Sequence, residues 1–531
     1  MKKILFIALM AGMVACTSIS SVRSVSDGHL TFIHMNDTYR IDAVEGGNAG
    51  GFGRVVTLLR NAKADGRDIR ITHGGDFLYP SLESQLWHGQ QIIEAFNFMN
   101  GIAPMLVIAG NHEFDRRTPE HLSNAVLASE FEWLGDNFQF KTGNKDVDGA
   151  LKSVYLYEHA GKRVGVFALT VHSDDGGNKR DYVPVDNQYA AIAEKTIVAL
   201  EQNGADVIFG LTHLHMWQDI EIAKLKARHP KFLFIVGGHE HEPQYSPASA
   251  VQAAVMKGAS NARVIWQIDV EFIDDQPRIL DAIKIAVDER VESAADYDEI
   301  SDKWRAQLLQ KFPFLTATIG YAAEPLDGRE FAIRERETNW GNLVTDQMRR
   351  AFGKPDADLA FINSGTLRID DFIVDRITFE DVGRTFGFSS YLRYLTLSGA
   401  EFRTVLEAGY RGDTPGLGHF PQVSGFRVCA DRSRPEGSRI VSLQVPVDGA
   451  WQEISADDEY RVVVPDFLYG GGDGYTFPKH RKASRPGSEL KYLVLDAIMA
   501  AQAQGKKVSA PVDPANPRIK MLKADGEPCF P

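Results

Sequence analysis

The chain has 531 residues, 44% of them hydrophobic and 24% charged, and its formal net charge is −13. A chain of this length exceeds what one hydrophobic core organises, so we expect two large domains. The acidic balance argues against general binding to nucleic acids or to anionic membrane surfaces, and any positive charge that meets a phosphate must therefore be local.

The start of the chain has the pattern of an export signal. Two lysines precede an apolar run at residues 4–14, and a small residue and then Cys16 follow. This predicts a signal peptide at residues 1–15, because the run is too short to span a bilayer. Cysteine at the cut favours lipidation of Cys16 and a tether at residues 16–28, with nearby cleavage without a lipid as the alternative. We therefore expect an exported lipoprotein of the periplasm or cell envelope, held at the membrane through its lipid anchor only.

From residue 29 to about residue 290, strand-like runs alternate with amphipathic segments such as residues 54–64 and 188–203. This alternation predicts an α/β domain. Five apolar, strand-like runs lie at residues 30–33, 69–72, 105–109, 207–211 and 232–236. Each run is followed by side chains that bind metals, namely Asp37, Asp76, Asn111, His213, His239 and His241.

The side chains after these runs suit a pair of metal ions. Carboxylate and amide oxygens beside imidazole nitrogens are ligands for divalent or trivalent ions, and one carboxylate can bridge two of them. The carboxyl ends of neighbouring strands in an open α/β sheet converge on one crevice, which brings such ligands together. The pattern therefore predicts a dimetal hydrolase.

These motifs resemble those of the metallophosphoesterase superfamily, and more narrowly those of the bacterial 5′-nucleotidase / UDP-sugar hydrolase / 2′,3′-cyclic phosphodiesterase family. The resemblance covers nearly the whole chain after the leader. It implies two metal sites that share Asp76 as a bridging ligand, filled by zinc, manganese or another divalent ion. One site would be completed by Asn111, His213 and His239, and the other by Asp37 and His241.

The run Gly-Asn-His-Glu-Phe-Asp at residues 110–115 carries the acid–base residues that the resemblance implies. His112 would act on the leaving-group side of the substrate. Asp115 would orient its imidazole and favour the charged form of the ring. The alternative is a solvated loop without a role in the chemistry, which the other four ligand motifs argue against.

One residue departs from the family pattern. The family has Asp-x-His where this chain has Asp37-Thr38-Tyr39, so one imidazole ligand is missing. Three outcomes are open: the site is weak or empty, Tyr39 binds the metal as a phenolate, or another side chain replaces the imidazole. Tyr79 is a candidate replacement, because residues 75–79 are similar to the Gly-Asp-x-x-Tyr motif of purple acid phosphatases, in which tyrosine binds iron(III). Phenolate favours a trivalent ion, and the alternative is that Tyr79 only packs beside the site.

The second half of the chain has a different pattern of helix-like and strand-like segments. Residues 291–315 are charged and helix-prone and predict a linker helix, and residues 316–531 mix helix-like and strand-like segments with many glycine turns. This mixture predicts an α+β domain. With three cysteines the chain has no disulfide framework; a bridge between Cys429 and Cys529 is permitted in an oxidising compartment but is not indicated by spacing.

The second domain contains motifs that resemble the nucleotide-binding motifs of the same family. The resemblance implies substrate-binding roles for Arg336, Asn363, Arg368, Phe388, Phe467 and Asp473. The arginines would bind a phosphate or carboxylate, the two polar side chains would bind the nucleoside, and the two phenylalanines would stack on its base. Phe386 aligns less securely than Phe388. The alternative is that these rings pack in a core and that the neighbouring glycines serve only a backbone turn.

We therefore predict an α/β protein with an N-terminal metallophosphoesterase sandwich at residues 29–290 and a C-terminal α+β nucleotide-binding domain. It would hydrolyse nucleoside 5′-monophosphates at a dimetal site between the domains. The alternatives are a nucleotide-sugar or 2′,3′-cyclic nucleotide phosphodiesterase and, from another class, a surface lipoprotein that binds nucleotides without catalysis. The nucleoside motifs argue against the family branch that hydrolyses sulfur-linked substrates.

Overall fold

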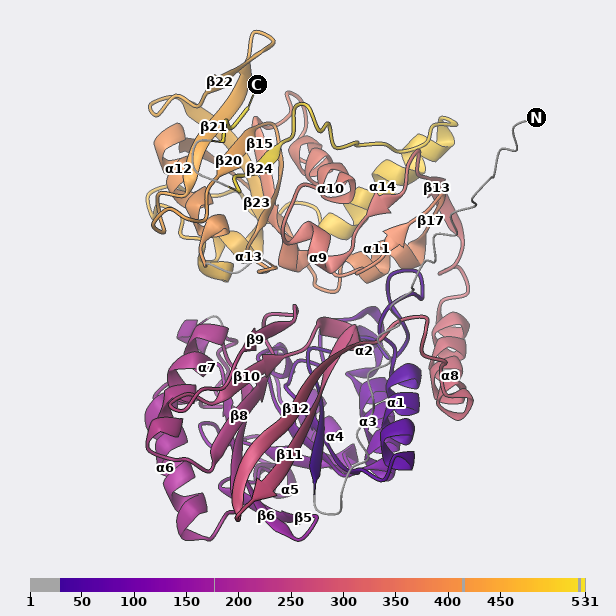
Figure 1. Ribbon diagram of the computed structural model, residues 1–531. Coiled ribbons are helices and arrows are strands. Elements are labelled where there is room, and N and C mark those ends of the chain that lie inside the picture. The colour runs from indigo at the N-terminus through magenta and orange to yellow at the C-terminus, as the bar shows by residue number, and fades with distance from the viewer. Residues whose placement is uncertain (1–28, 176, 413–415, 524–526, 531) are drawn as a thin grey trace, which may run out of the picture.

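The computed structural model shows two domains, one above the other in Figure 1. It describes residues 29–175, 177–412, 416–523 and 527–530. The predicted signal peptide, lipidation site and tether lie outside these residues. In the described part of the chain, no helix is long and apolar enough to cross a membrane.

The first sheet of the N-terminal domain has six strands among the described residues. Their order is β12 (Gln276–Ala286), β11 (Val264–Ile273), β1 (Leu30–Met35), β2 (Asp68–His73), β3 (Met105–Ile108) and β4 (Glu132–Leu134). Strands β1 to β4 are parallel, whereas β11 and β12 form an antiparallel extension. Every residue of β1 and β3 is buried, in agreement with their uninterrupted apolar sequence.

The second sheet also has six strands among the described residues. Their order is β5 (Tyr155–His159), β6 (Lys162–Thr170), β7 (Val207–His213), β8 (Phe232–Gly237), β10 (Ala254–Lys257) and β9 (Gln244–Ser246). The four central strands are parallel. The ring of Phe32 in β1 packs against Phe209 in β7 and Phe234 in β8, with centroids 5.0 and 5.3 Å apart, so the two sheets share one core.

Helices cover the outer faces of both sheets and complete a layered sandwich. The N-terminal domain contains α1 (Phe52–Ala64), α2 (Leu82–Trp87), α3 (Gln90–Ile102), α4 (Glu120–Ala128), α5 (Lys145–Asp148), α6 (Tyr189–Gln202) and α7 (Met216–Ala223). Figure 1 shows α1 and α3 outside the first sheet and α6 and α7 outside the second. Helix α1 buries Phe52, Val55, Val56 and Leu59, one face of a helix with 3.6 residues per turn.

Helix α8 (Ala295–Lys311) lies inside the predicted linker and joins the two domains. It packs on the N-terminal domain, beside α1 and α3 (Figure 1). Trp304 of α8 contacts Trp87, with ring centroids 5.1 Å apart, and its indole N–H donates to Glu94. The linker helix is therefore attached to the first domain.

The C-terminal domain combines sheets and helices, as an α+β domain does. Among the described residues, one four-stranded sheet has the order β18 (Leu392–Ser398), β23 (Glu459–Pro465), β15 (Leu359–Asn363) and β19 (Pro421–Ser424). The other has the order β22 (Ala450–Glu453), β21 (Ile440–Val447), β20 (Arg427–Ala430) and β24 (Ile519–Met521). Short pairs are formed by β13 (Thr318–Tyr321) with β17 (Arg376–Thr378) and by β14 (Leu326–Asp327) with β16 (Phe372–Ile373).

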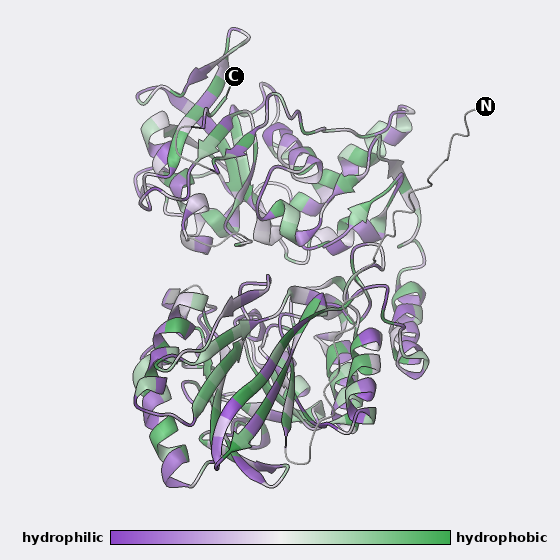
Figure 2. Ribbon diagram, in the orientation of Figure 1, coloured by the Kyte–Doolittle hydropathy of each residue, from purple (hydrophilic) through white to green (hydrophobic). Residues whose placement is uncertain are grey.

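The helices of this domain are α9 (Glu330–Ile333), α10 (Asn339–Arg350), α11 (Phe379–Thr385), α12 (Gly399–Glu407), α13 (Asp466–Tyr469) and α14 (Leu490–Ala503). Helix α10 begins where the Thr338 hydroxyl accepts a hydrogen bond from the Gly341 backbone N–H. Figure 2 shows hydrophobic residues along the strands of both domains, which is where the cores lie. The predicted fold class is confirmed.

A disulfide bond joins Cys429 in β20 to Cys529, with Cα atoms 5.5 Å apart. It lies next to the parallel pairing of β20 with β24, so it fastens the C-terminal segment to the second small sheet. The spacing of the cysteines did not indicate this pair, because 100 residues separate them in sequence.

Candidate metal centre between the domains

The predicted metal ligands lie at the carboxyl ends of β1, β2, β3, β7 and β8, with His213 as the last residue of β7 and the others in the loops that follow the strands. These strands are parallel within each sheet, so the loops meet at one edge of the sandwich. Two of the loops approach each other so closely that only glycine fits. A Cβ atom on Gly110 would lie 2.2 Å from Asp76 Oδ1, and Gly75 has a φ of +85°.

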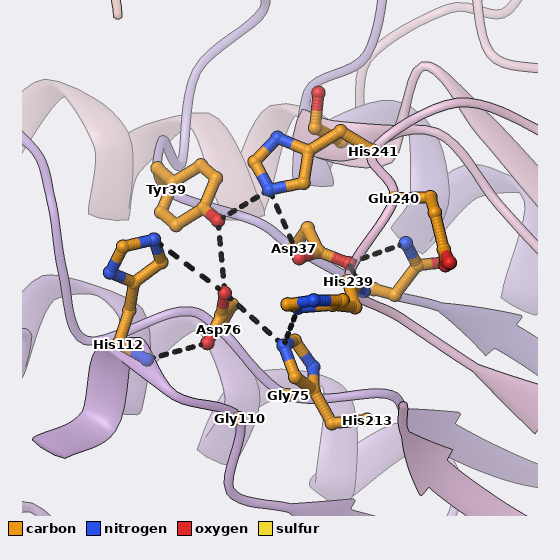
Figure 3. Close-up of polar contacts among 12 residues, drawn as sticks. Asp37, Tyr39, Gly75, Asp76, Gly110, His112, His213, His239, Glu240 and His241 are labelled. Carbon is orange, nitrogen blue, oxygen red and sulfur yellow. Dashed lines mark hydrogen bonds and ion pairs between the residues drawn. The ribbon is translucent and has the colours of Figure 1, made fainter. Parts of the chain in front are cut away.

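The first group of ligand atoms comes from Asp37, Asp76 and His241, within 4.8 Å of one another (Figure 3). Asp37 Oδ1 is 3.2 Å from His241 Nε2, and this buried oxygen has no hydrogen-bond partner among the described residues. The other oxygen accepts hydrogen bonds from the Asn36 side chain and the His239 backbone N–H, which fix the carboxylate. A divalent cation would satisfy the unpaired oxygen, so these residues fit a metal site.

The second group shares Asp76. His213 Nε2 is 3.3 Å from Asp76 Oδ2, and both Asn111 Oδ1 and His239 Nδ1 lie near the same nitrogen, at 3.2 and 3.3 Å. The other ring nitrogen of His213 is 2.6 Å from the Gly74 carbonyl oxygen, which leaves Nε2 for the site. Two oxygen-and-nitrogen groups that share one carboxylate suit a pair of divalent ions.

Four of the six candidate ligands have a left-handed backbone conformation. The φ angle is 52° at Asp37, 60° at Asp76, 90° at His239 and 62° at His241. Such angles cost on the order of 1–3 kcal/mol for a residue other than glycine, and they cluster at functional sites. The surrounding fold therefore holds these side chains in positions that an unconstrained loop would avoid.

The carboxylates give this site a negative field. Burial alone would raise the pKa of Asp76, but His213 and His112 hold it well below its usual range. Burial would likewise lower the pKa of His213, whereas Asp76 and Asp37 raise it to about 9. A field that retains a proton on His213 also favours a divalent cation, whose binding would displace that proton.

His112 stands beside the ligand group and is oriented from two sides. Its Nδ1 is 3.0 Å from Asp115 Oδ2, and Asp115 also accepts a hydrogen bond from the Asn178 side chain. Its Nε2 faces the second domain, 3.2 Å from a guanidinium nitrogen of Arg368. Burial alone would lower the pKa of His112, but Asp115 and Asp76 raise it above the ordinary histidine value. This geometry suits a proton donor.

The two tyrosines that the sequence analysis named as candidate metal ligands lie in different places. The Tyr39 hydroxyl is 2.9 Å from His241 Nε2 and 3.3 Å from Asp76 Oδ2, among the ligand atoms (Figure 3). Burial and the charge of Asp76 raise the pKa of the Tyr39 phenol well above its usual value. The Tyr79 hydroxyl instead lies 2.9 Å from His88 Nδ1. The structure thus brings Tyr39 to the ligand group and places Tyr79 against His88.

Glu113 is a buried residue that sequence reasoning missed. Its carboxylate accepts hydrogen bonds from the backbone N–H groups of Asp76, Phe77, Leu78 and Gly110. It therefore fixes the loop after β2 against the loop after β3. Its position inside the Asn-His-Glu-Phe-Asp run was the signal that could have indicated it.

The C-terminal domain places two predicted substrate residues against His112. The ring of Phe388 is half-buried, with its centroid 5.7 Å from that of His112. The Arg368 guanidinium lies over the Phe388 ring, 5.4 Å from its centroid. Phe386 is 1% exposed and belongs to the core, so Phe388 is the ring of the two that borders the site.

The predicted nucleoside contacts lie near one another in the same domain. Asn363 Nδ2 donates a hydrogen bond to Asp473 Oδ2 at 2.7 Å. Phe467, at the start of α13, is 50% exposed, and a Cβ on Gly472 would lie 2.5 Å from its ring. The glycine therefore leaves room for an aromatic ring that is free to stack on a ligand.

Arg336 is placed away from this group. Its side chain is 52% exposed, and its guanidinium lies 3.5 Å from Asp327. Arg334, two residues earlier, is buried and contacts the carboxylate of Glu330, which also lies 3.9 Å from Arg368. Arg334 Nε and Arg368 Nη1 are buried without hydrogen-bond partners in the described part of the chain. Arg334, which the sequence analysis did not single out, is therefore the buried arginine beside Glu330, whereas Arg336 is exposed.

Comparisons with known proteins agree with this architecture. Residues 30–243 match the family model of calcineurin-like phosphoesterases, and residues 318–480 match that of the 5′-nucleotidase C-terminal domain. The chain is 25% identical over 91% of its length to the trifunctional nucleotide phosphoesterase protein YfkN of Bacillus subtilis, but it spans only 34% of that protein. It is 24% identical to a snake venom 5′-nucleotidase of Gloydius brevicauda, covering 87% of this chain and 84% of the relative.

A solved structure shares the whole fold. It is a 5′-nucleotidase precursor from Thermus thermophilus, 24% identical, with a TM-score of 0.78 over 93% of this chain and all of the other. The sandwich with its shared carboxylate defines a metal-dependent phosphoesterase, and the protein is a hydrolase. With its second domain, the chain belongs to the 5′-nucleotidase family of calcineurin-like phosphoesterases.

Proposed function

We propose that this protein hydrolyses nucleoside 5′-monophosphates to a nucleoside and phosphate. One observation carries the proposal: His112 from the first domain and Arg368 from the second face each other with 3.2 Å between their nitrogens. A proton donor for a leaving oxygen and a guanidinium that can bind phosphate therefore border the same space.

The residues fit two ions at the shared carboxylate, with Asp37 and His241 at the first position and Asn111, His213 and His239 at the second. Divalent ions there would stabilise charge on the phosphoryl group and activate the attacking water. The remaining steps belong to side chains. Protonated His112, oriented by Asp115, would donate a proton from Nε2 to the 5′-oxygen of the nucleoside as the P–O bond breaks.

Substrate binding would use the second domain. Arg334 Nε and Arg368 Nη1 are both buried and unpaired among the described residues, so they are donors available to phosphate oxygens. Phe388 and Phe467 would stack on the base, a contact that contributes about 1–3 kcal/mol. Asp473, held by Asn363, would accept hydrogen bonds from the ribose hydroxyls.

The identity of the metals depends on Tyr39. Its hydroxyl lies among the ligand atoms, so any tyrosinate–iron(III) bond would involve Tyr39 rather than Tyr79. We expect a colourless protein with divalent ions, in which Tyr39→Phe preserves activity. A visible charge-transfer band that reductants bleach and Tyr39→Phe removes would establish iron(III) instead.

A second candidate activity is hydrolysis of nucleotide phosphodiesters, such as nucleotide sugars or 2′,3′-cyclic nucleotides. The name of the Bacillus subtilis relative, a trifunctional nucleotide phosphoesterase, favours this broader range. A site built from stacking rings and arginines would bind the nucleotide portion of either substrate class.

We also propose export with lipidation at Cys16. The disulfide between Cys429 and Cys529 supports an oxidising compartment. Mass spectrometry of the mature N-terminal peptide tests this: we expect a diacylglyceryl group on Cys16, and an unmodified N-terminus elsewhere would contradict it.

The central experiment is metal analysis of the purified mature protein with a phosphate-release screen over nucleoside 5′-monophosphates, nucleotide sugars and 2′,3′-cyclic nucleotides. We expect two metal ions per chain and the highest kcat/KM for a 5′-monophosphate. Asp76→Ala and Asn111→Ala should abolish turnover with the fold intact. Near-wild-type turnover in either variant, or a chain without metal, would contradict the proposal.

A further inference from the structure

Glu330 reaches from the second domain into the metal site of the first. It is the first residue of α9, and its side chain is 4% exposed. Glu330 Oε1 is 2.7 Å from His241 Nδ1, and Oε2 accepts a hydrogen bond from the Ser260 hydroxyl at 2.5 Å. Both of these partners belong to the N-terminal domain, so one carboxylate spans the domain boundary.

This contact decides which nitrogen of His241 is free to bind a metal. A carboxylate at Nδ1 accepts its N–H, which places the lone pair on Nε2. Nε2 is the atom that faces Asp37, at 3.2 Å. Glu330 therefore selects the tautomer and the ring orientation that the first metal position requires.

The carboxylate is held firmly by its own domain. The Glu330 backbone N–H donates to Asp370 Oδ1 at 2.9 Å, and Asp370 Oδ2 accepts a hydrogen bond from Asn261 of the first domain at 2.9 Å. Arg334 forms an ion pair with the Glu330 carboxylate. The first turn of α9 is thus fixed against the metal loops when the domains are packed together.

A small cavity lies at this part of the domain boundary. The cavity beside Tyr39, Glu330 and Arg368 measures about 20 Å³, room for about one water molecule. A carboxylate that crosses the boundary here depends on the two domains keeping this arrangement. If the domains separated, His241 Nδ1 would lose its contact with Glu330 and would be hydrated instead.

Metal binding at the first position depends on the orientation of His241 by Glu330. Its candidate protein ligands are Asp37, Asp76 and His241, and the residue at position 39 is a tyrosine. With one imidazole as the nitrogen ligand, the affinity of the position depends strongly on how that imidazole is oriented.

We propose that Glu330 is a positioning residue that couples metal binding at the first position to the packing of the two domains. The packed arrangement orients His241 for the metal, and by thermodynamic reciprocity a bound metal stabilises the packed arrangement. This inference rests on the proposed function only in taking the site to be a metal site.

The test is metal binding by the full-length mature chain, stripped of metal and titrated calorimetrically with Mn²⁺ alone. Removing an outer partner of a metal ligand costs about 10- to 100-fold in affinity. We expect Glu330→Ala to weaken one of two Mn²⁺ sites by that factor and to leave the other unchanged, and Glu330→Gln to recover part of the loss. Glu324→Ala is the matched control, because its carboxylate accepts hydrogen bonds from Ser509 of the same domain.

Small-angle X-ray scattering of the same samples reports the domain arrangement. We expect Mn²⁺ to make the wild-type chain more compact and to do so less in Glu330→Ala, with thermal unfolding showing that the variant is folded. Unchanged affinities at both sites in a folded Glu330→Ala chain would overturn the inference, as would Mn²⁺-independent scattering of the wild type. A wild-type chain that binds no Mn²⁺ would overturn the proposed function itself, an outcome visible before any variant is compared.

Discussion

Replacing Arg334 or Arg336 with alanine should separate a substrate-binding arginine from a surface one. The two residues belong to the same short segment, yet Arg334 is 5% exposed next to Glu330, whereas Arg336 is 52% exposed next to Asp327. They form a matched pair, because each variant removes the same side chain and the same formal charge.

The expected magnitudes follow from these environments. Arg334 Nε is buried and has no hydrogen-bond partner among the residues that the structure describes. A hydrogen bond from a charged group to phosphate contributes about 1.5–3 kcal/mol. Its loss should therefore lower kcat/KM for a nucleoside 5′-monophosphate by about 10- to 150-fold. The Arg336 pair with Asp327 is an exposed contact at 3.5 Å, which contributes about 0–1 kcal/mol. Arg336→Ala should change kcat/KM by less than about fivefold.

The assay is phosphate release under initial-rate conditions, with metal content measured in parallel. Arg334→Lys is the control for charge: it keeps the positive charge but not the planar fork, and should recover only part of the loss. A larger defect in Arg336→Ala than in Arg334→Ala would refute the reasoning and restore the residue that the sequence motif favoured. Equal and small defects would show that neither arginine binds the phosphate.

Three further predictions concern the proton donor His112, the stacking of the nucleobase and the disulfide bond. Asp115→Asn should shift the alkaline limb of the pH–rate profile to lower pH. His112 is protonated and active below its pKa, and Asp115 contributes to raising that pKa. An unchanged alkaline limb would contradict this role of Asp115. Phe467→Ala should weaken nucleotide turnover by about 5- to 150-fold but leave a small aryl phosphate nearly unaffected, and equal loss for both would make Phe467 structural. Cys429→Ala should lower the free energy of unfolding by about 2–5 kcal/mol in a denaturant titration, because the disulfide bond with Cys529 closes a long loop. Dithiothreitol should destabilise the wild type but not the variant. Equal effects of dithiothreitol on both proteins would argue against the disulfide bond.

The metal group could be anticipated because its signals are local. Each of Asp37, Asp76 and His213 ends or follows an apolar run, and the runs form strands β1, β2 and β7. Parallel strands in one sheet end at the same edge, which brings Asp37 and Asp76 together. His213 comes from the second sheet and reaches them because the two sheets pack face to face. The structure adds that Gly110 lies where two of these loops touch.

The choice between neighbouring residues could not be made from the sequence. The sequence motif indicated Arg336, whereas in the structure Arg334 contacts Glu330 and Arg336 contacts Asp327. Tyr39 and Tyr79 likewise both occur in plausible ligand motifs. Burial and partners decide between them, and both depend on packing against residues far away in sequence.

The fold class, the family and the order of the candidate metal ligands could be predicted from the sequence, because hydrophobic periodicity and short motifs are properties of contiguous residues. Three contacts became visible only in the folded chain: Glu330 meets His241 across 89 positions, Arg368 faces His112, and Cys429 pairs with Cys529. These contacts arise when two separately folded domains, or two distant segments of one domain, are packed together. No local pattern encodes them, because each partner is an ordinary charged, aromatic or sulfur-containing side chain until the other one lies beside it.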